Sequence, residues 1–161
     1  MYRTVKPHAI SLFADAAMAL EDGVLGMLAQ ASGVDIPTDC EDEDQIDYIN
    51  VLRESILEAY TGIVQGLKDG KKEHNVVPAI DSIVTLIHRG TSDKHCVPAV
   101  LKASIALLGD LGNTFGNRML QIFSQAYILQ LLQEGQSYED MREIVQWTNG
   151  IVQSVRAGKH A

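Results

Sequence analysis

The residues of this sequence best suited to chemistry are carboxylates and one tryptophan, spaced as neighbours on a helix would be. Glu143 and Trp147 lie four positions apart, and Trp147 is the only tryptophan among the 161 residues. Side chains at that spacing lie one above the other on a helix. The face of an indole attracts a cation and a nearby carboxylate pairs with it, so this pair suits a lysine or arginine ligand. Two alternatives stay open: the tryptophan folds onto an adjacent loop, and the acid is only solvated.

Further acids lie at helical spacing elsewhere in the chain. A polar line at intervals of three and four residues runs along segment 45–69 and consists of Asp47, Asn50, Glu54, Glu58, Thr61 and Gln65. Asp110 has the corresponding position in segment 96–115. Asp15 lies 95 residues before Asp110 and is its equivalent in an internal repeat, so the two acids are not a catalytic dyad. These acids suit a basic partner, although acids on an exposed helix face are usually only solvated.

The charge of the chain narrows the class of partner. Acids are densest at Asp39, Glu41, Asp42, Glu43 and Asp44, in a run that is either a soluble connector, which we favour, or a hook for a basic peptide. The whole chain has a formal charge of −8. This charge argues against nucleic acid, whose phosphates need a basic surface. It favours a basic partner, unless the acidity serves only solubility.

Signatures of an enzyme, a metal site or a membrane segment were sought and are weak. Cys40 and Cys96 belong to no CxxC pair, and the five histidines show no ligand spacing such as HExxH. No glycine-rich phosphate loop or GxSxG turn occurs. No run approaches the roughly 18 apolar residues of a membrane helix, and the N-terminus lacks the apolar core of a signal peptide. We therefore expect no enzyme, no metal, no cofactor, no membrane insertion, and a cytosolic or nuclear location.

The elements that must position these side chains are helices. Apolar residues recur at intervals of three and four, and no alternating, β-branched run competes with this pattern. Glycines 70 and 90 suit the left-handed conformation after a helix, and Ser137 suits a helix N-cap. The sequence thus predicts an all-α fold of about seven helices, over residues 7–21, 23–33, 45–69, 76–89, 96–115, 117–134 and 138–157.

An internal repeat organises these helices. Residues 8–31 match residues 103–126 at several identical positions, and half of that offset gives a further match around residue 60. The period of about 47 residues is at the upper end of the range of HEAT and armadillo repeats. We therefore expect a single HEAT-repeat α-solenoid over 1–161, with stacked antiparallel pairs at 23–69, 76–115 and 117–157. Segment 7–21 would be the second helix of a pair whose first helix is missing, which suggests a fragment of a longer array.

Four segments resemble the C-terminal part of the importin-β (karyopherin-β) family of nuclear transport receptors. LRESILEAYTGIVQGLKD at 52–69 is the most specific, and PHAISLFADAAMALE at 7–21 is similar to the helix one repeat earlier. ALLGDLGNTFG at 106–116 and EIVQWTNGIVQSVR at 143–156 fit the last repeats of the family in order and spacing. The resemblance covers nearly the whole chain. The loop 35–45, the linker 70–78 and the surroundings of Met141 depart from the family pattern.

The resemblance implies a non-enzymatic binding module that grips a basic helix, such as the importin-β-binding domain of importin-α. It assigns Trp147 as the aromatic contact and Glu54, Glu58, Asp110 and Asp15 as acidic contacts, beside Glu143. It also implies nucleoporins as further partners, a Ran-GTP site mainly outside this segment, and a place in the cytoplasm, the nucleus and the nuclear pore. The alternative is a purely structural HEAT scaffold of another complex.

Overall fold

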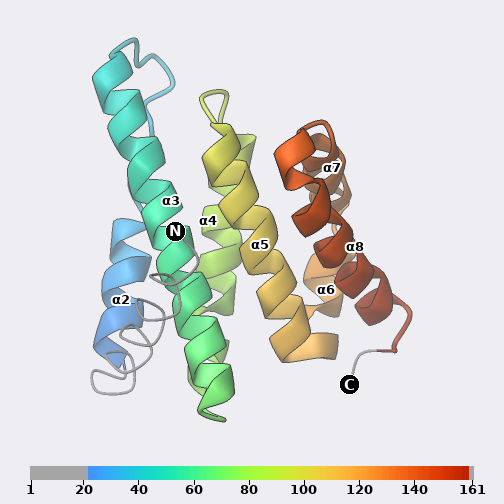
Figure 1. The fold of residues 1–161 in the computed structure, drawn as a ribbon. Coiled ribbons are helices and arrows are strands. Elements are labelled where there is room, and N and C mark those ends of the chain that lie inside the picture. Colours follow the sequence, from blue (N-terminus) through green and yellow to red (C-terminus); the bar gives the residue numbers. More distant parts are fainter. Residues whose placement is uncertain (1–21, 160–161) are drawn as a thin grey trace, which may run out of the picture. The chain divides into compact units, whose positions relative to one another are not determined.

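The computed structural model describes residues 22–159, and their regular structure is entirely helical (Figure 1). The all-α prediction is therefore confirmed for this part of the chain. The predicted helix 7–21, which contains Asp15, lies outside the described residues. None of the described helices is both long and apolar enough to cross a membrane. In chain order the elements are α2 (Asp22–Ala31), α3 (Glu43–Asp69), η1 (Glu73–Ala79), α4 (Ile80–Ser92), α5 (Pro98–Phe115), η2 (Gly116–Met119), α6 (Leu120–Phe123), α7 (Ala126–Gln136), η3 (Glu139–Met141) and α8 (Arg142–Arg156).

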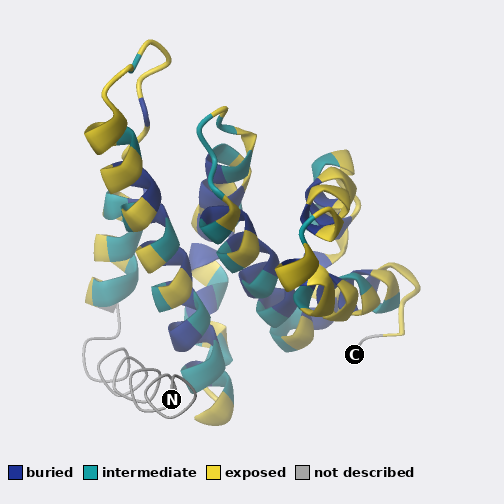
Figure 2. Cartoon of the chain, turned by 45° about the horizontal axis from the view of Figure 1, so that its top comes forward, coloured by how far each residue is buried: buried dark blue, intermediate teal, exposed yellow. Residues whose placement is uncertain are grey.

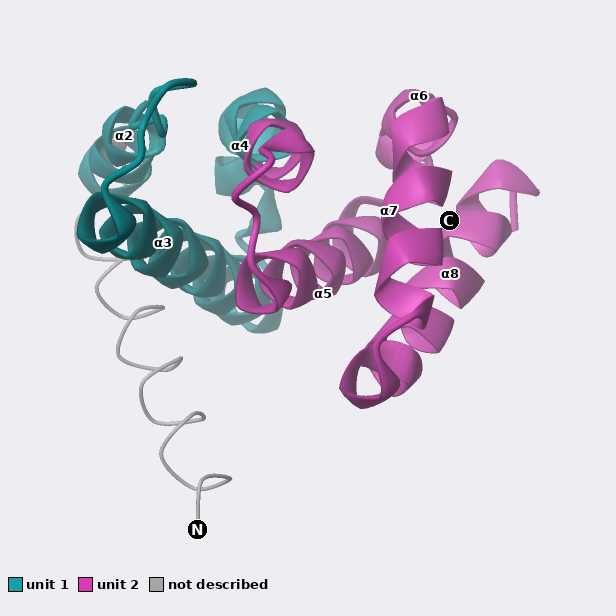
Figure 3. Cartoon of the chain, turned by 90° about the horizontal axis from the view of Figure 1, so that it is seen from above, with its two compact units in different colours: residues 1–86 teal, residues 87–161 magenta. Residues whose placement is uncertain are grey.

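The chain forms two compact units, residues 1–86 and 87–161 (Figure 3). In the first unit, α3 buries one stripe of side chains, and η1 packs against both α3 and α2. The stripe contains the fully buried Tyr60, Ile63 and Val64. In the second unit, α5 packs against α8, and α7 contacts both of these helices. Figure 2 shows the buried residues in dark blue along these helices and the exposed residues in yellow. Burial of each large apolar side chain contributes roughly 1.5–3 kcal/mol.

Helix α3 is the longest element, and its start follows from the local sequence. The side chain of Asp42 caps the helix: its Oδ1 accepts hydrogen bonds from the backbone N–H groups of Asp44 at 3.1 Å and Gln45 at 3.3 Å. Glu43 and Asp44 lie in the first turn, where the helix dipole favours anions. Part of the acidic run therefore has a structural role as a helix cap.

Helix α3 ends at Asp69 as predicted, but the left-handed residue after it lies one position later than predicted. Gly70 has φ −79°, and the left-handed residue is Lys71, with φ 56°. The N–H of Lys72 donates to the carbonyl oxygen of Leu67 at 2.7 Å and that of Lys71 to Lys68 at 3.0 Å, which is the Schellman arrangement of a helix end. The prediction for Gly90 was wrong as well, because this residue lies inside α4.

The predicted single helix over 117–134 is wrong, because the structure interrupts it. Helix α6 ends at Phe123, Gln125 is extended with ψ 139°, and α7 begins at Ala126. The hydroxyl of Ser124 donates to the carbonyl oxygen of Leu120 at 2.7 Å, a bond back to the preceding turn of the kind that bends helices. The interruption lets α6 and α7 each bury its own residues, Phe123 on one side and Ile128, Leu131 and Leu132 on the other.

The predicted N-cap at Ser137 is wrong too. Ser137 closes the preceding helix α7, and its hydroxyl donates to the carbonyl oxygen of Glu134 at 2.7 Å. Helix α8 begins after η3 without a side-chain cap. The role of Ser137 is thus to end one helix and not to start the next.

The second unit is packed closely through glycines. A Cβ atom on Gly112 of α5 would lie 2.6 Å from Cγ2 of Ile151 and 2.7 Å from Cε2 of Phe123. A Cβ atom on Gly135 of α7 would lie 2.5 Å from Cδ1 of Ile105. These distances are too short for any side chain, so the helices approach here because glycine leaves the space.

Candidate partner-binding site

Trp147 lies on the solvent side of α8 and packs against α5. The residue is 41 % exposed, whereas Val145, Thr148, Ile151 and Val152 on the same helix are buried. The sequence prediction that Trp147 lies off the buried stripe is therefore correct. Its Cζ3 and Cε3 atoms lie directly above Gly109, where a Cβ atom would overlap the indole. The ring thus packs against a neighbouring helix, and not onto an adjacent loop.

Thr148, the next residue of α8, fixes the position of this helix along α5. Its buried hydroxyl donates a hydrogen bond to the carbonyl oxygen of Ile105, 3.0 Å away. A buried hydroxyl needs such a partner, because an unpaired one costs roughly 1–3 kcal/mol. Since Trp147 and Thr148 are adjacent, this bond also sets where the indole meets α5.

Two of the acids predicted to accompany Trp147 lie on α8 and α5, the two helices that meet at the indole. Glu143 is exposed and lies one helical turn before Trp147, where side chains four apart are neighbours. Asp110 directly follows Gly109, is partly exposed, and already interacts with other groups of the chain. The arrangement therefore combines a half-exposed indole with a carboxylate on the same helix face.

Two cations near the start of α8 are engaged in ion pairs. Lys102 Nζ lies 3.2 Å from Asp140 Oδ2, and Arg142 Nη1 lies 3.9 Å from Glu139 Oε1. Both ion pairs are exposed, so each contributes at most about 1 kcal/mol. Within the described residues Glu143 has no hydrogen bond or ion pair. Its carboxylate is therefore open to a cation from outside.

The acids predicted on α3 lie in the first unit. Glu58 is exposed and has interactions of its own, and Glu54 is partly exposed. Asn50, predicted to belong to the same polar line, is only 3 % exposed and lies on the buried side. The line is therefore not a continuous exposed strip.

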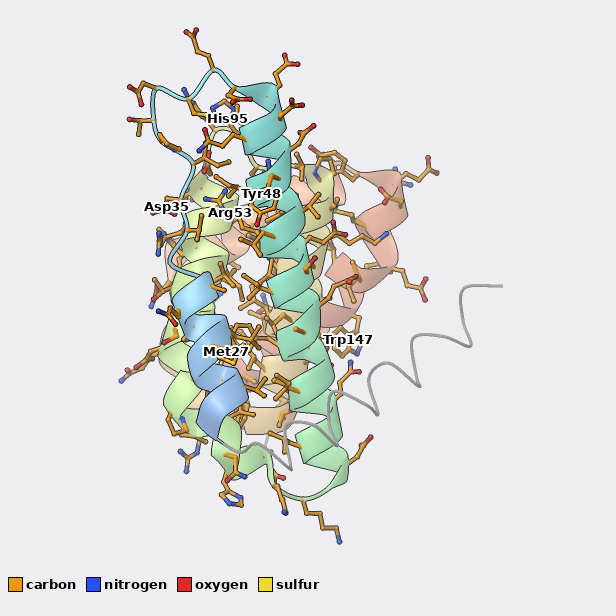
Figure 4. All side chains as sticks on the ribbon, turned by 90° about the vertical axis from the view of Figure 1, so that its left-hand side faces the viewer. Met27, Asp35, Tyr48, Arg53, His95 and Trp147 are labelled. Atoms are coloured by element: carbon orange, nitrogen blue, oxygen red, sulfur yellow. The ribbon has the colours of Figure 1, made fainter. Side chains whose placement is uncertain are left out.

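Two exposed apolar residues on α3 escaped the sequence prediction. Tyr48 is 67 % exposed and Val51 is 61 % exposed (Figure 4). Tyr48, Val51, Ser55 and Glu58 follow each other at intervals of three and four and lie opposite the buried stripe. That spacing is visible in the sequence, but the polar line predicted on this helix contains neither Tyr48 nor Val51.

The only cation of this region is buried. Residues 39–58 contain eight acids and one basic residue, Arg53. Arg53 is 3 % exposed, and its Nη2 lies 3.5 Å from Oδ1 of Asp35 in the loop before α3 (Figure 4). The guanidinium therefore ties the loop to the helix, and the exposed charged side chains of residues 39–58 are all carboxylates.

Within the described residues, no three His, Cys, Asp or Glu side chains are gathered for metal binding. Burial raises the pKa of the phenols of Tyr60 and Tyr127, and the Ser32 hydroxyl offsets part of this effect at Tyr60. Phenols with raised pKa stay neutral at physiological pH, so these residues act as packed side chains.

Comparison with known proteins identifies the class of protein. The family described as "Importin subunit beta-1-like, TPR repeats" matches residues 1–136. This chain belongs to the importin-β family. The importin subunit beta-1 of Schizosaccharomyces pombe is 31 % identical over 167 residues, which cover 96 % of this chain and 19 % of the relative. That of Arabidopsis thaliana is 31 % identical over 157 residues, covering 91 % of this chain and 18 % of the relative. The chain thus spans about a fifth of the length of these relatives.

Solved structures agree with the fold. A crystal structure of importin beta, obtained in an ammonium sulfate condition, has a TM-score of 0.77 and 26 % identity, and the match covers 92 % of this chain and 18 % of that one. A Kap95:Nup1 complex has a TM-score of 0.76 at 20 % identity, covering 98 % and 19 % of the two chains, and supports the fold alone. The predictions of an importin-β-type helical-repeat fold and of membership in this family are confirmed. The binding roles of Trp147, Glu143, Asp110, Glu54, Glu58 and Asp15 stay predictions.

Proposed function

We propose that this chain is the C-terminal part of a nuclear import receptor and that it binds a Lys/Arg-rich helix, such as the importin-β-binding domain of importin-α. The observation that carries the proposal is the half-exposed indole of Trp147 beside the carboxylate of Glu143. The chain acts by binding and performs no covalent chemistry. The receptor would work in the cytoplasm, the nucleus and the nuclear pore.

The small energy of each contact favours binding through many contacts, and salt should weaken this binding. A cation on an exposed indole contributes about 0.5–1 kcal/mol. An exposed ion pair contributes about 0.2–1 kcal/mol and is screened by salt. Asp110 next to the indole, and Glu54 and Glu58 on α3, would add contacts of the same small size. We therefore expect weak binding by this segment, with specificity arising from many contacts.

Further partners are proposed from the relatives. One structural neighbour is Kap95 in a complex with Nup1, and another is Kap95p bound to RanGDP, with a TM-score of 0.76 and 20 % identity over 98 % of this chain and 20 % of that one. We propose that the receptor containing this chain likewise binds nucleoporins and Ran. The Ran site would lie mainly outside this segment.

Titration of a labelled Lys/Arg-rich helical peptide into the chain tests the proposal. We expect binding at low salt, weakening at high salt, and a further loss of about two- to fivefold with Trp147→Ala, the size of one cation–indole contact. Leu129→Ala is the matched control, because Leu129 is 42 % exposed on α7 and has no role in the site. Absence of binding at low salt, or equal effects of the two variants, would refute the site and favour a purely structural scaffold.

A further inference from the structure

We propose that Gly109 is a positioning residue for partner binding, because its missing side chain sets how deeply the Trp147 indole lies against α5. The inference rests on the proposed function and deepens it. Gly109 is the residue that positions the indole. The contact with Gly109 also determines which edge of the indole faces a ligand.

The geometry at Gly109 singles out the indole. A Cβ atom on Gly109 would overlap Cζ3 of Trp147 and lie 2.7 Å from its Cε3. It would also lie 2.7 Å from Oγ1 of Thr148. Distances this short do not occur between real side chains, so something must move if Gly109 gains a side chain. The hydrogen bond from Thr148 to Ile105 holds α8 in place. The overlap is deepest with the indole, which is exposed, so we expect the ring to move most, while the short contact with Thr148 also disturbs its hydrogen bond to Ile105.

The atoms that touch Gly109 also define the free edge of the ring. Cε3 and Cζ3 belong to the edge of the indole opposite Nε1. Because that edge packs against α5, Nε1–H lies on the opposite edge of the ring. There it makes no hydrogen bond within the described residues. A ligand would thus meet the indole face with a Lys or Arg cation, beside Glu143, and present a carbonyl oxygen to Nε1–H.

Gly109 differs from the other closely packed glycines of this unit. Gly112 and Gly135 are covered by side chains of the core, namely Ile151 and Phe123, and Ile105 and Val145. Substitution there would disturb the core itself. Gly109 is covered mainly by Trp147, which is 41 % exposed, and also by the buried hydroxyl of Thr148, so substitution there changes the position of an exposed ring as well as one buried contact.

The first test measures the position of the indole without any ligand. Trp147 is the only tryptophan, so intrinsic fluorescence reports on it alone. We expect Gly109→Ala to increase acrylamide quenching and to shift the emission to longer wavelength. Gly150→Ala is the matched control on α8, because a Cβ atom there would meet nothing within 4 Å. Identical quenching of Gly109→Ala and the unchanged protein would overturn the positioning role, whatever the protein binds.

The second test is a double-mutant cycle in binding, with the labelled basic helix as probe. Gly109→Ala should weaken binding by about two- to fivefold, as Trp147→Ala does. In the Trp147→Ala background it should have no further effect on binding, and it should lower the melting temperature less, because only the contact with Thr148 remains. An equal loss in both backgrounds would overturn the proposal. If the unchanged protein does not bind the peptide, the proposed function fails, while the quenching result still decides the position of the ring.

Discussion

At the scale of single residues, the molecule uses polar side chains in two opposite ways. Trp147 and Glu143 face solvent, as their distance from the apolar stripe of α8 indicated. Arg53 and Asn50 are buried, although charged and amide side chains are usually exposed. Sequence periodicity could identify the first pair because α8 alone determines which way they point. It could not identify the second pair, because their burial depends on contacts such as that of Arg53 with Asp35, which lies 18 residues away.

The contact between Arg53 and Asp35 gives a prediction at this scale. Asp35→Asn should lower the free energy of unfolding by about 1 kcal/mol, because the buried guanidinium loses part of its compensation while the half-exposed carboxylate limits the loss. Chemical denaturation measures the change. Asp39→Asn removes the same charge from the same loop at an exposed position and should have little effect. Equal losses in the two variants would mean that general charge, and not the contact, is responsible.

At the scale of elements, the existence of the helices was predictable and their ends were not. The long apolar periodicity along 45–69 predicted α3 with its correct last residue. The interruption at Ser124 and Gln125 carries neither glycine nor proline, so no local signal marks it. It arises because α6 and α7 bury different sets of residues, which is a tertiary effect. The end of α3 likewise depends on which residue completes the Schellman hydrogen bonds.

The end of α3 gives a second prediction. Lys71 holds a left-handed conformation that favours glycine, so Lys71→Gly should stabilise the protein by up to about 1 kcal/mol. Thermal unfolding should show a melting temperature higher by a few degrees. Gly70→Ala is the control, since φ −79° suits any residue, and it should be nearly neutral. A lower melting temperature for Lys71→Gly would contradict the assigned helix end.

The exposed face of α3 gives a third prediction. Tyr48→Ala should change the free energy of unfolding by no more than about 0.5 kcal/mol, because the side chain is mostly exposed. Ile49→Ala, one position along the helix, should cost about 2–5 kcal/mol, since Ile49 is only 3 % exposed. Urea denaturation of both variants compares them directly. Similar losses would show that the face assigned to solvent is covered.

At the scale of the whole molecule, family membership could be predicted from the sequence, because segments such as 52–69 resemble importin-β proteins specifically. The repeat period alone would have fitted any HEAT scaffold. The close contact of Trp147 with Gly109 could not be predicted from the sequence, because it depends on how α5 packs against α8. The net charge of −8 and the exposed Glu143 one turn from Trp147 agree with the proposed binding of basic partners.

The emission of Trp147 during titration with a basic helix tests the central claim most directly. We expect a saturable change in emission with a Lys/Arg-rich peptide, a weaker change at high salt, and no change with a Glu-rich peptide of equal length. Glu143→Gln should weaken the response to the basic peptide. An emission that stays constant while the basic peptide binds, or that responds equally to both peptides, would contradict a cation site at Trp147.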